Sequence, residues 1–157
     1  MNTVTAAELA RVSLFEGLPE DELAGLASVS TRRHLADGDV LFEQGQPART
    51  LYIVVAGGLV LRAGGEGASV IVDTLRPGDL VGWSAMREGA TTLSTGRAVG
   101  AAEIVAIPVD PIVDLAAGGS RESKRLVRRI VALAAAHLEA SWSQLLQARS
   151  EGVISAG

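Results

Sequence analysis

The residues that most often carry catalysis or hold metal ions are sparse in this sequence. The chain has no cysteine, which excludes thiolate metal sites, disulfides and a cysteine nucleophile. Its two histidines, His34 and His137, stand far apart, and neither belongs to a spacing typical of metal ligands. The sequence also lacks a Gly-x-Ser-x-Gly elbow, a P-loop and a histidine-supported nucleophile. We therefore expect that the chain is not an enzyme and that it holds no metal ion or resident cofactor.

One dense group of basic side chains lies toward the C-terminal end. It comprises Arg121, Lys124, Arg125, Arg128 and Arg129. Such a group is ordinarily a solvated helix face, and an acidic partner or a nucleic acid are the alternatives. The whole chain has 14 basic against 18 acidic residues, a net charge of −4, so it does not attract nucleic acid globally.

These side chains must be positioned by one domain, because 157 residues of which 48% are hydrophobic can bury a sizeable core. Intrinsic disorder is excluded by the same composition. The N-terminus carries no basic segment followed by an apolar one, and no run of about 18 apolar residues occurs. We expect a cytoplasmic protein that does not enter a membrane.

The residue pattern changes twice along the chain. It predicts a helical lead-in over 1–29, a β-rich part over 30–108 and C-terminal helices over 109–150. The lead-in has capping-box spacing from Thr5 to Glu8, and Pro19 followed by acidic residues marks a second helix start. In the β-rich part, short apolar runs alternate with Gly, Pro and Asp, which is typical of an antiparallel β-roll of the jelly-roll, or double-stranded β-helix, type. Within it, the Gly57-Gly58 pair predicts a tight hairpin.

The C-terminal segment predicts a short helix near Pro111, a break at Gly118-Gly119, and a long helix from the N-cap Ser120 to about Ala148. The apolar stripe of this helix is wide enough to face two surfaces, so we expect a homodimer formed through it. The expected seam draws on Leu126, Ile130, Leu133, His137 and Leu145. Only nine residues follow Ala148, and we expect no DNA-binding domain after it.

Two stretches carry a family resemblance: 38–45, which reads GDVLFEQG, and 51–60, which reads LYIVVAGGLV. With the order of helix, β-roll and helix, they resemble the cyclic nucleotide-binding domain family, as in the effector domain of catabolite activator protein. The resemblance covers almost the whole chain. It implies a stand-alone regulatory domain with a β-roll fold.

The resemblance also implies a ligand site, a phosphate-binding cassette of loop and short helix that holds a cyclic phosphate through backbone N–H groups and one Arg. In the family the cassette reads Gly-Glu-Leu-Ala, with the Arg about ten positions after the Gly. Here Trp83 replaces the Glu, which would bind the ribose, and Thr92 stands where the Arg should be. We expect weak or absent binding of cyclic AMP, with Arg87 or Arg97 as the candidates to replace the missing cation.

The residues left for a ligand are Gly82, Ser84 and Ala85, whose small side chains leave backbone amides open, and the hydroxyls of Thr91 and Thr92. Trp83 would be a gate or a stacking platform for the ligand, or it would plug the pocket. The expected effector is a small molecule, a cyclic nucleotide or another anion.

We therefore favour a ligand-responsive regulatory domain that passes its state to a partner protein. The alternative is a structural interaction and dimerisation module whose pocket is plugged by Trp83. A third class, a cupin-like enzyme, is disfavoured because the sequence has no histidine cluster.

Overall fold

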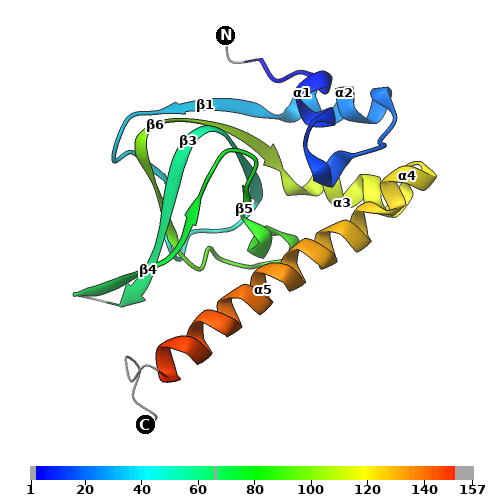
Figure 1. Cartoon of the computed structure of the whole chain (residues 1–157). Coiled ribbons are helices and arrows are strands. Elements are labelled where there is room, and N and C mark those ends of the chain that lie inside the picture. Colours follow the sequence, from blue (N-terminus) through cyan, green and yellow to red (C-terminus); the bar gives the residue numbers. More distant parts are fainter. Residues whose placement is uncertain (1–2, 66, 151–157) are drawn as a thin grey trace.

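A computed structural model describes residues 3–65 and 67–150, and shows an antiparallel β-roll with helices before and after it (Figure 1). The expected fold class is confirmed. The described residues form one six-stranded sheet with the order β1-β6-β3-β4, in which β2 pairs with β6 and β5 with β3. The elements in chain order are α1 Ala6–Ala10, η1 Ser13–Phe15, α2 Glu20–Val29, β1 Thr31–Leu35, β2 Val40–Phe42, β3 Thr50–Gly65, β4 Ala68–Leu75, β5 Leu80–Val81, η2 Trp83–Met86, β6 Thr95–Pro108, α3 Val109–Gly118, α4 Arg121–Lys124 and α5 Leu126–Ser150.

The long strands β3 and β6 pair with each other and form the body of the roll. The expected hairpin at Gly57-Gly58 is wrong, because β3 continues through both glycines and turns into β4 only after Gly65. Gly57 has φ 77°, and the register of β3 against β6 shifts between Val54 and Ala56 and again between Ala56 and Gly58. A Cβ at Gly57 would lie 2.2 Å from the backbone oxygen of Ala101. The left-handed glycine that suggested a turn instead makes a β-bulge, which bends two paired strands together.

Both faces of β3 are buried at its start, which explains the apolar run there. Tyr52 and Val54 point into the roll and join one hydrophobic cluster. Leu51 and Ile53 point to the other side, into a second cluster shared with the N-terminal helices, α3 and Leu126. Strand side chains alternate between faces, so one strand joins the two cores.

Strand β4 forms an edge of the sheet, since among the described strands it pairs with β3 alone. Its middle residues Val70, Ile71 and Val72 are all exposed. The hairpin of β3 and β4 projects beyond the roll (Figure 1).

The sequence predicted one continuous C-terminal helix from Ser120, which is wrong. The helix is divided at Arg125 into α4 and α5. The N–H of Arg125 bonds to the carbonyl of Glu122, three residues back, at 3.1 Å. This tighter turn accompanies the burial of Ser123, whose hydroxyl lies 2.9 Å from the carbonyl of Leu115. Ser120 caps α4 as expected, with its side chain accepting from the N–H of Ser123.

The apolar residues of α5 belong to two different faces. Leu126 is fully buried in the core of its own chain, and Ile130 and Leu133 pack against that core. The expected seam needs correction at Leu126, because a fully buried side chain cannot contact a second chain. Ile130 and Leu133 are half-buried, and their place in a seam stays a prediction. The exposed apolar side chains form another face, called here the outer stripe: Val127, Val131, Leu138, Trp142, Leu145 and Leu146. The side chain of His137 lies outside the described part of the structure.

No helix within residues 3–65 and 67–150, α5 included, is both long enough and apolar enough to span a bilayer.

A charged cluster ties the N-terminal helix to the sheet. The side chain of Arg32 on β1 is only 8% exposed, and its guanidinium pairs with the carboxylates of Glu8 on α1 and Glu103 on β6. The hydrogen bond from Arg32 holds the pKa of Glu8 below its ordinary value of 4.5. The capping box predicted from Thr5 to Glu8 is present, so Glu8 also accepts from the backbone N–H of Thr5.

We expect Glu8→Gln to lower the free energy of unfolding by about 1 kcal/mol near neutral pH, because the substitution removes a charge-assisted hydrogen bond to a buried cation. The folded pKa of Glu8 is the lower one, so this stabilisation is complete above the unfolded pKa and is lost as pH falls through the folded pKa. Urea unfolding of both proteins at several pH values should show the difference shrinking below about pH 4.5. The exposed Glu139→Gln serves as a control, and a difference that persists unchanged into acid would contradict the assignment.

Candidate functional site

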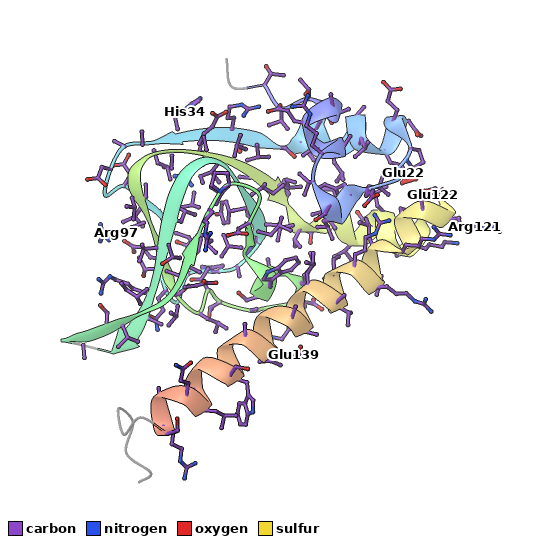
Figure 2. All side chains as sticks on the ribbon, in the orientation of Figure 1. Glu22, His34, Arg97, Arg121, Glu122 and Glu139 are labelled. Carbon is purple, nitrogen blue, oxygen red and sulfur yellow. The ribbon has the colours of Figure 1, made fainter. Side chains whose placement is uncertain are left out.

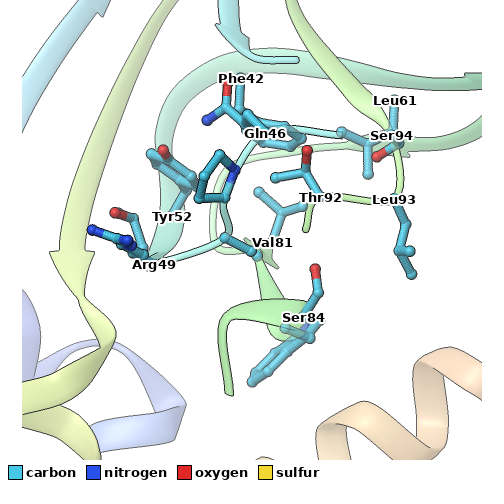
Figure 3. A pocket seen from close by; sticks show the side chains of 15 residues that line it. Phe42, Gln46, Arg49, Tyr52, Leu61, Val81, Ser84, Thr92, Leu93 and Ser94 are labelled. Atoms are coloured by element: carbon cyan, nitrogen blue, oxygen red, sulfur yellow. The ribbon is translucent and has the colours of Figure 1, made fainter. Parts of the chain in front are cut away.

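A pocket of about 180 Å³ opens inside the roll, between the segment that joins β2 to β3 and the segment that carries η2 (Figure 3). Most of its surface is apolar or neutral. The lining residues are Phe42, Gln46, Pro47, Ala48, Arg49, Thr50, Tyr52, Leu61, Val81, Gly82, Trp83, Ser84, Thr92, Leu93 and Ser94. Four of the six residues expected at the site, Gly82, Trp83, Ser84 and Thr92, therefore border one pocket.

Gly82 lets the chain turn from β5 into η2 against the pocket. Its φ is 103°, in the left-handed region, and a Cβ there would lie 2.4 Å from the backbone oxygen of Thr50. Only glycine fits this position without a shift of β3. Ser84 follows on the pocket wall, while Ala85 is buried, with its N–H donating to the carbonyl of Gly82 at 3.0 Å. The backbone donor expected at Ala85 is thus already used within the turn.

The two threonines lie on different sides of the returning segment. Thr92 borders the pocket, and its hydroxyl donates to the carbonyl of Glu43. Its backbone N–H donates to Gln46 and its carbonyl accepts from Gly45, both at 2.9 Å. Thr91 forms a bridge with Pro47 and borders a second hollow outside the pocket. These bonds fasten the segment that closes the pocket to the end of β2.

Trp83 stands between the pocket and the C-terminal helix. It borders the pocket on one side, and on another side it borders a hollow that is also lined by Leu133 and Ala136 of α5. The ring is partly buried and packs against the hydrophobic cluster shared with the N-terminal helices. This position suits a stacking platform and a plug equally, so the role of Trp83 remains a prediction.

Neither arginine considered as a replacement cation borders the pocket. Arg97 donates to the carbonyl of Gly38 at 3.0 Å and lies at the side of the roll away from the helices (Figure 2). Arg87 borders the second hollow. The pocket is lined instead by Arg49, which also borders the second hollow and which the sequence analysis did not single out. Arg49 stands immediately before the first residue of β3, a position that carries no sequence signal of a site.

The histidines and acids do not form a second chemical centre in the described residues. His34 lies exposed on β1 (Figure 2). Within residues 3–65 and 67–150, the His, Asp and Glu side chains form no cluster that could hold a metal ion.

Comparison with known proteins finds one matching family model and several solved structures of the same fold. A family model described as Cyclic nucleotide-binding domain matches residues 32–118, more than half of the chain. A search of curated proteins finds no similar sequence. Among solved structures, a cyclic nucleotide-binding-like protein from Brucella abortus is 28% identical with a TM-score of 0.60, over 72% of this chain and 97% of that chain.

Two further solved structures share the fold at lower identity. A cyclic nucleotide-binding domain from Methylobacillus flagellatus is 15% identical with a TM-score of 0.76, over 94% of this chain and 88% of that chain. A c-di-GMP responsive global regulator from Xanthomonas campestris is 21% identical with a TM-score of 0.66, over 76% and 59% of the two chains.

We expect Thr92→Val to lower the free energy of unfolding by about 1 kcal/mol, because the carbonyl of Glu43 loses its donor while the side-chain volume stays nearly the same. Thr92→Ser retains the hydroxyl and should keep most of the stability. Chemical denaturation of the three proteins measures the difference, and equal stability of Val and Ser variants would show that this bond contributes nothing.

Proposed function

Because the chain belongs to the cyclic nucleotide-binding domain family, we propose that it is a regulatory domain that binds a small effector in the pocket beside Gly82 and signals through α5. A domain of this family is typically a non-catalytic regulatory module. The observation that carries the proposal is the pocket itself, which lies beside the left-handed Gly82 at the place where the cassette is expected. Its aromatic and apolar lining with a few polar groups is typical of a small-molecule site.

We further propose that ordinary cyclic nucleotide binding is lost or altered. At the cassette, Trp83 stands in the place of the carboxylate and Thr92 in the place of the cation. Losing one partner of a buried charge pair costs several kcal/mol of binding energy. The pocket of about 180 Å³ is also smaller than the roughly 300–1,000 Å³ of drug-sized ligand sites. The Xanthomonas protein, described as c-di-GMP responsive, illustrates that the fold serves more than one effector.

The proposed output passes through Trp83 to α5. A ligand that moves this ring changes the surface against which Leu133 and Ala136 lie, because the ring borders both hollows. The outer stripe of α5 then supports a homodimer or a partner protein. Val131, Leu138 and Leu145 recur every seven residues on this stripe, as in a helix pair.

The second candidate is an interaction and dimerisation module that binds no effector. The partial burial of Trp83 and the small pocket favour it. A thermal-shift panel of nucleotides and small metabolites separates the two, because a ligand at about 100 times its dissociation constant adds about 2.7 kcal/mol of stability. Unchanged melting across the panel would favour the interaction module.

We expect the double variant Trp83→Glu with Thr92→Arg to bind cyclic AMP at least about tenfold more tightly than the unmodified chain, because it restores a carboxylate for the ribose and a cation for the phosphate. Isothermal titration calorimetry measures both affinities. The single variant Thr92→Arg controls for loss of the bond to Glu43. Submicromolar binding of cyclic AMP by the unmodified chain would contradict the proposed loss.

We expect Leu138→Glu to convert a dimer into a monomer at micromolar concentration, because it places a charge in the centre of the outer stripe. The control is Ser143→Glu, which adds the same charge to an exposed position roughly 140° around the helix axis. Sedimentation velocity measures the assembly. A monomeric unmodified chain, or a Leu138→Glu variant that remains dimeric, would overturn the proposed interface.

A further inference from the structure

The pocket has a charge pattern opposite to that of the whole chain. The chain carries a net charge of −4, yet no Asp or Glu is among the described residues that line the pocket. Arg49 is the one charged side chain in that lining. A pocket with one cation and no acid favours a ligand with a negative charge.

The guanidinium of Arg49 is available for a ligand, because no hydrogen bond or ion pair joins it to any described residue. Three other arginines of the roll already have partners. Arg32 forms ion pairs with two carboxylates, and Arg33 and Arg97 donate hydrogen bonds to the carbonyls of Leu41 and Gly38. The backbone of Arg49 is fixed, since its carbonyl accepts from the N–H of Val109 at 3.0 Å. The Cα that carries the guanidinium is therefore held at the rim of the pocket.

The interior of the pocket is aromatic. The rings of Phe42 and Tyr52 stack with centroids 5.4 Å apart and an angle of 22° between their planes. Both residues are buried and both line the pocket, and Trp83 lines it as well. Figure 3 shows Arg49 on the same side of the pocket as Tyr52, with Leu93 across from them. Flat aromatic walls favour a planar ligand body.

We propose that the pocket binds a small planar aromatic anion, with Arg49 pairing the carboxylate or phosphate group while the ring lies among Phe42, Tyr52 and Trp83. This inference deepens the proposed effector function and rests on it. The cation comes from the segment between β2 and β3 and not from the cassette position held by Thr92. A guanidinium offers two parallel donors to either type of anion.

Tryptophan fluorescence can test the proposal in the full chain. The sequence has two tryptophans, so Trp142→Phe leaves Trp83 as the reporter in the pocket wall. The probes are benzoate and phenyl phosphate, which are anionic, and benzamide, which has the same ring without the charge. Titration of each probe at fixed ionic strength gives three dissociation constants.

We expect both anions, or the one whose group fits, to bind at least about tenfold more tightly than benzamide, as a charged hydrogen bond predicts. In Arg49→Ala this preference should disappear while benzamide binding is kept, and Arg49→Lys should restore part of it. Arg87→Ala, which changes a cation outside the pocket, should leave all three constants unchanged. Thermal unfolding of each variant checks that it is folded.

Three outcomes would overturn the inference. Benzamide binding as tightly as both anions would reject the anionic ligand and leave the proposed effector pocket standing. An anion preference that survives in Arg49→Ala, or that is lost in Arg87→Ala, would move the cation elsewhere. Absence of binding for all three probes would contradict the aromatic pocket and the inference together, and the nucleotide and metabolite panel would then decide the effector function separately.

Discussion

The pairing of β3 with β6 is the interaction on which the other parts of this chain depend. These two strands supply residues to the inside of the roll and, on their opposite faces, to the cluster that holds the N-terminal helices and α3. They can do both because successive side chains of a strand point to opposite faces, and the bulge where Gly57 lies against Ala101 bends the two strands together. The pocket also depends on β3, since its wall begins with Thr50 and Tyr52 at the start of that strand and continues onto Val81, which pairs with Tyr52.

The types of secondary-structure element and their order could be predicted from the sequence, because apolar periodicity and turn residues depend on local geometry. Gly57 was misassigned, since a left-handed glycine suits a hairpin and a bulge alike and only the partner strand decides between them. The sequence-based seam also joined residues from two faces of α5. The burial of Leu126 could not be foreseen, because it depends on helices near the N-terminus, far away in the sequence. Arg49 was missed because a single arginine in a connecting segment has no periodic signature, and its place beside the pocket follows from tertiary structure.

The site and the C-terminal helix share one physical element, the ring of Trp83. In a cassette that held a carboxylate here, the side chain would be committed to the ligand by charge. A tryptophan is held by apolar contact instead. Its ring can contact both the pocket and the hollow beside Leu133. The coupling between effector and helix would then depend on how the ring is shared between them. The left-handed backbone at Gly82 and the hydrogen bonds around Thr92 would hold the rest of the loop in place if the ring moved.

The edge strand β4 brings a different consequence, for the behaviour of the chain in concentrated solution and on heating. Its segment Ala68–Val72 is uncharged, contains three exposed branched aliphatic residues, and has backbone groups open along one side. Such an edge is a template for strands from other molecules, which leads to aggregation. Asp73 is the one charge within β4. It therefore acts as a gatekeeper, since stacking copies of β4 side by side in register would bring like charges together at every layer.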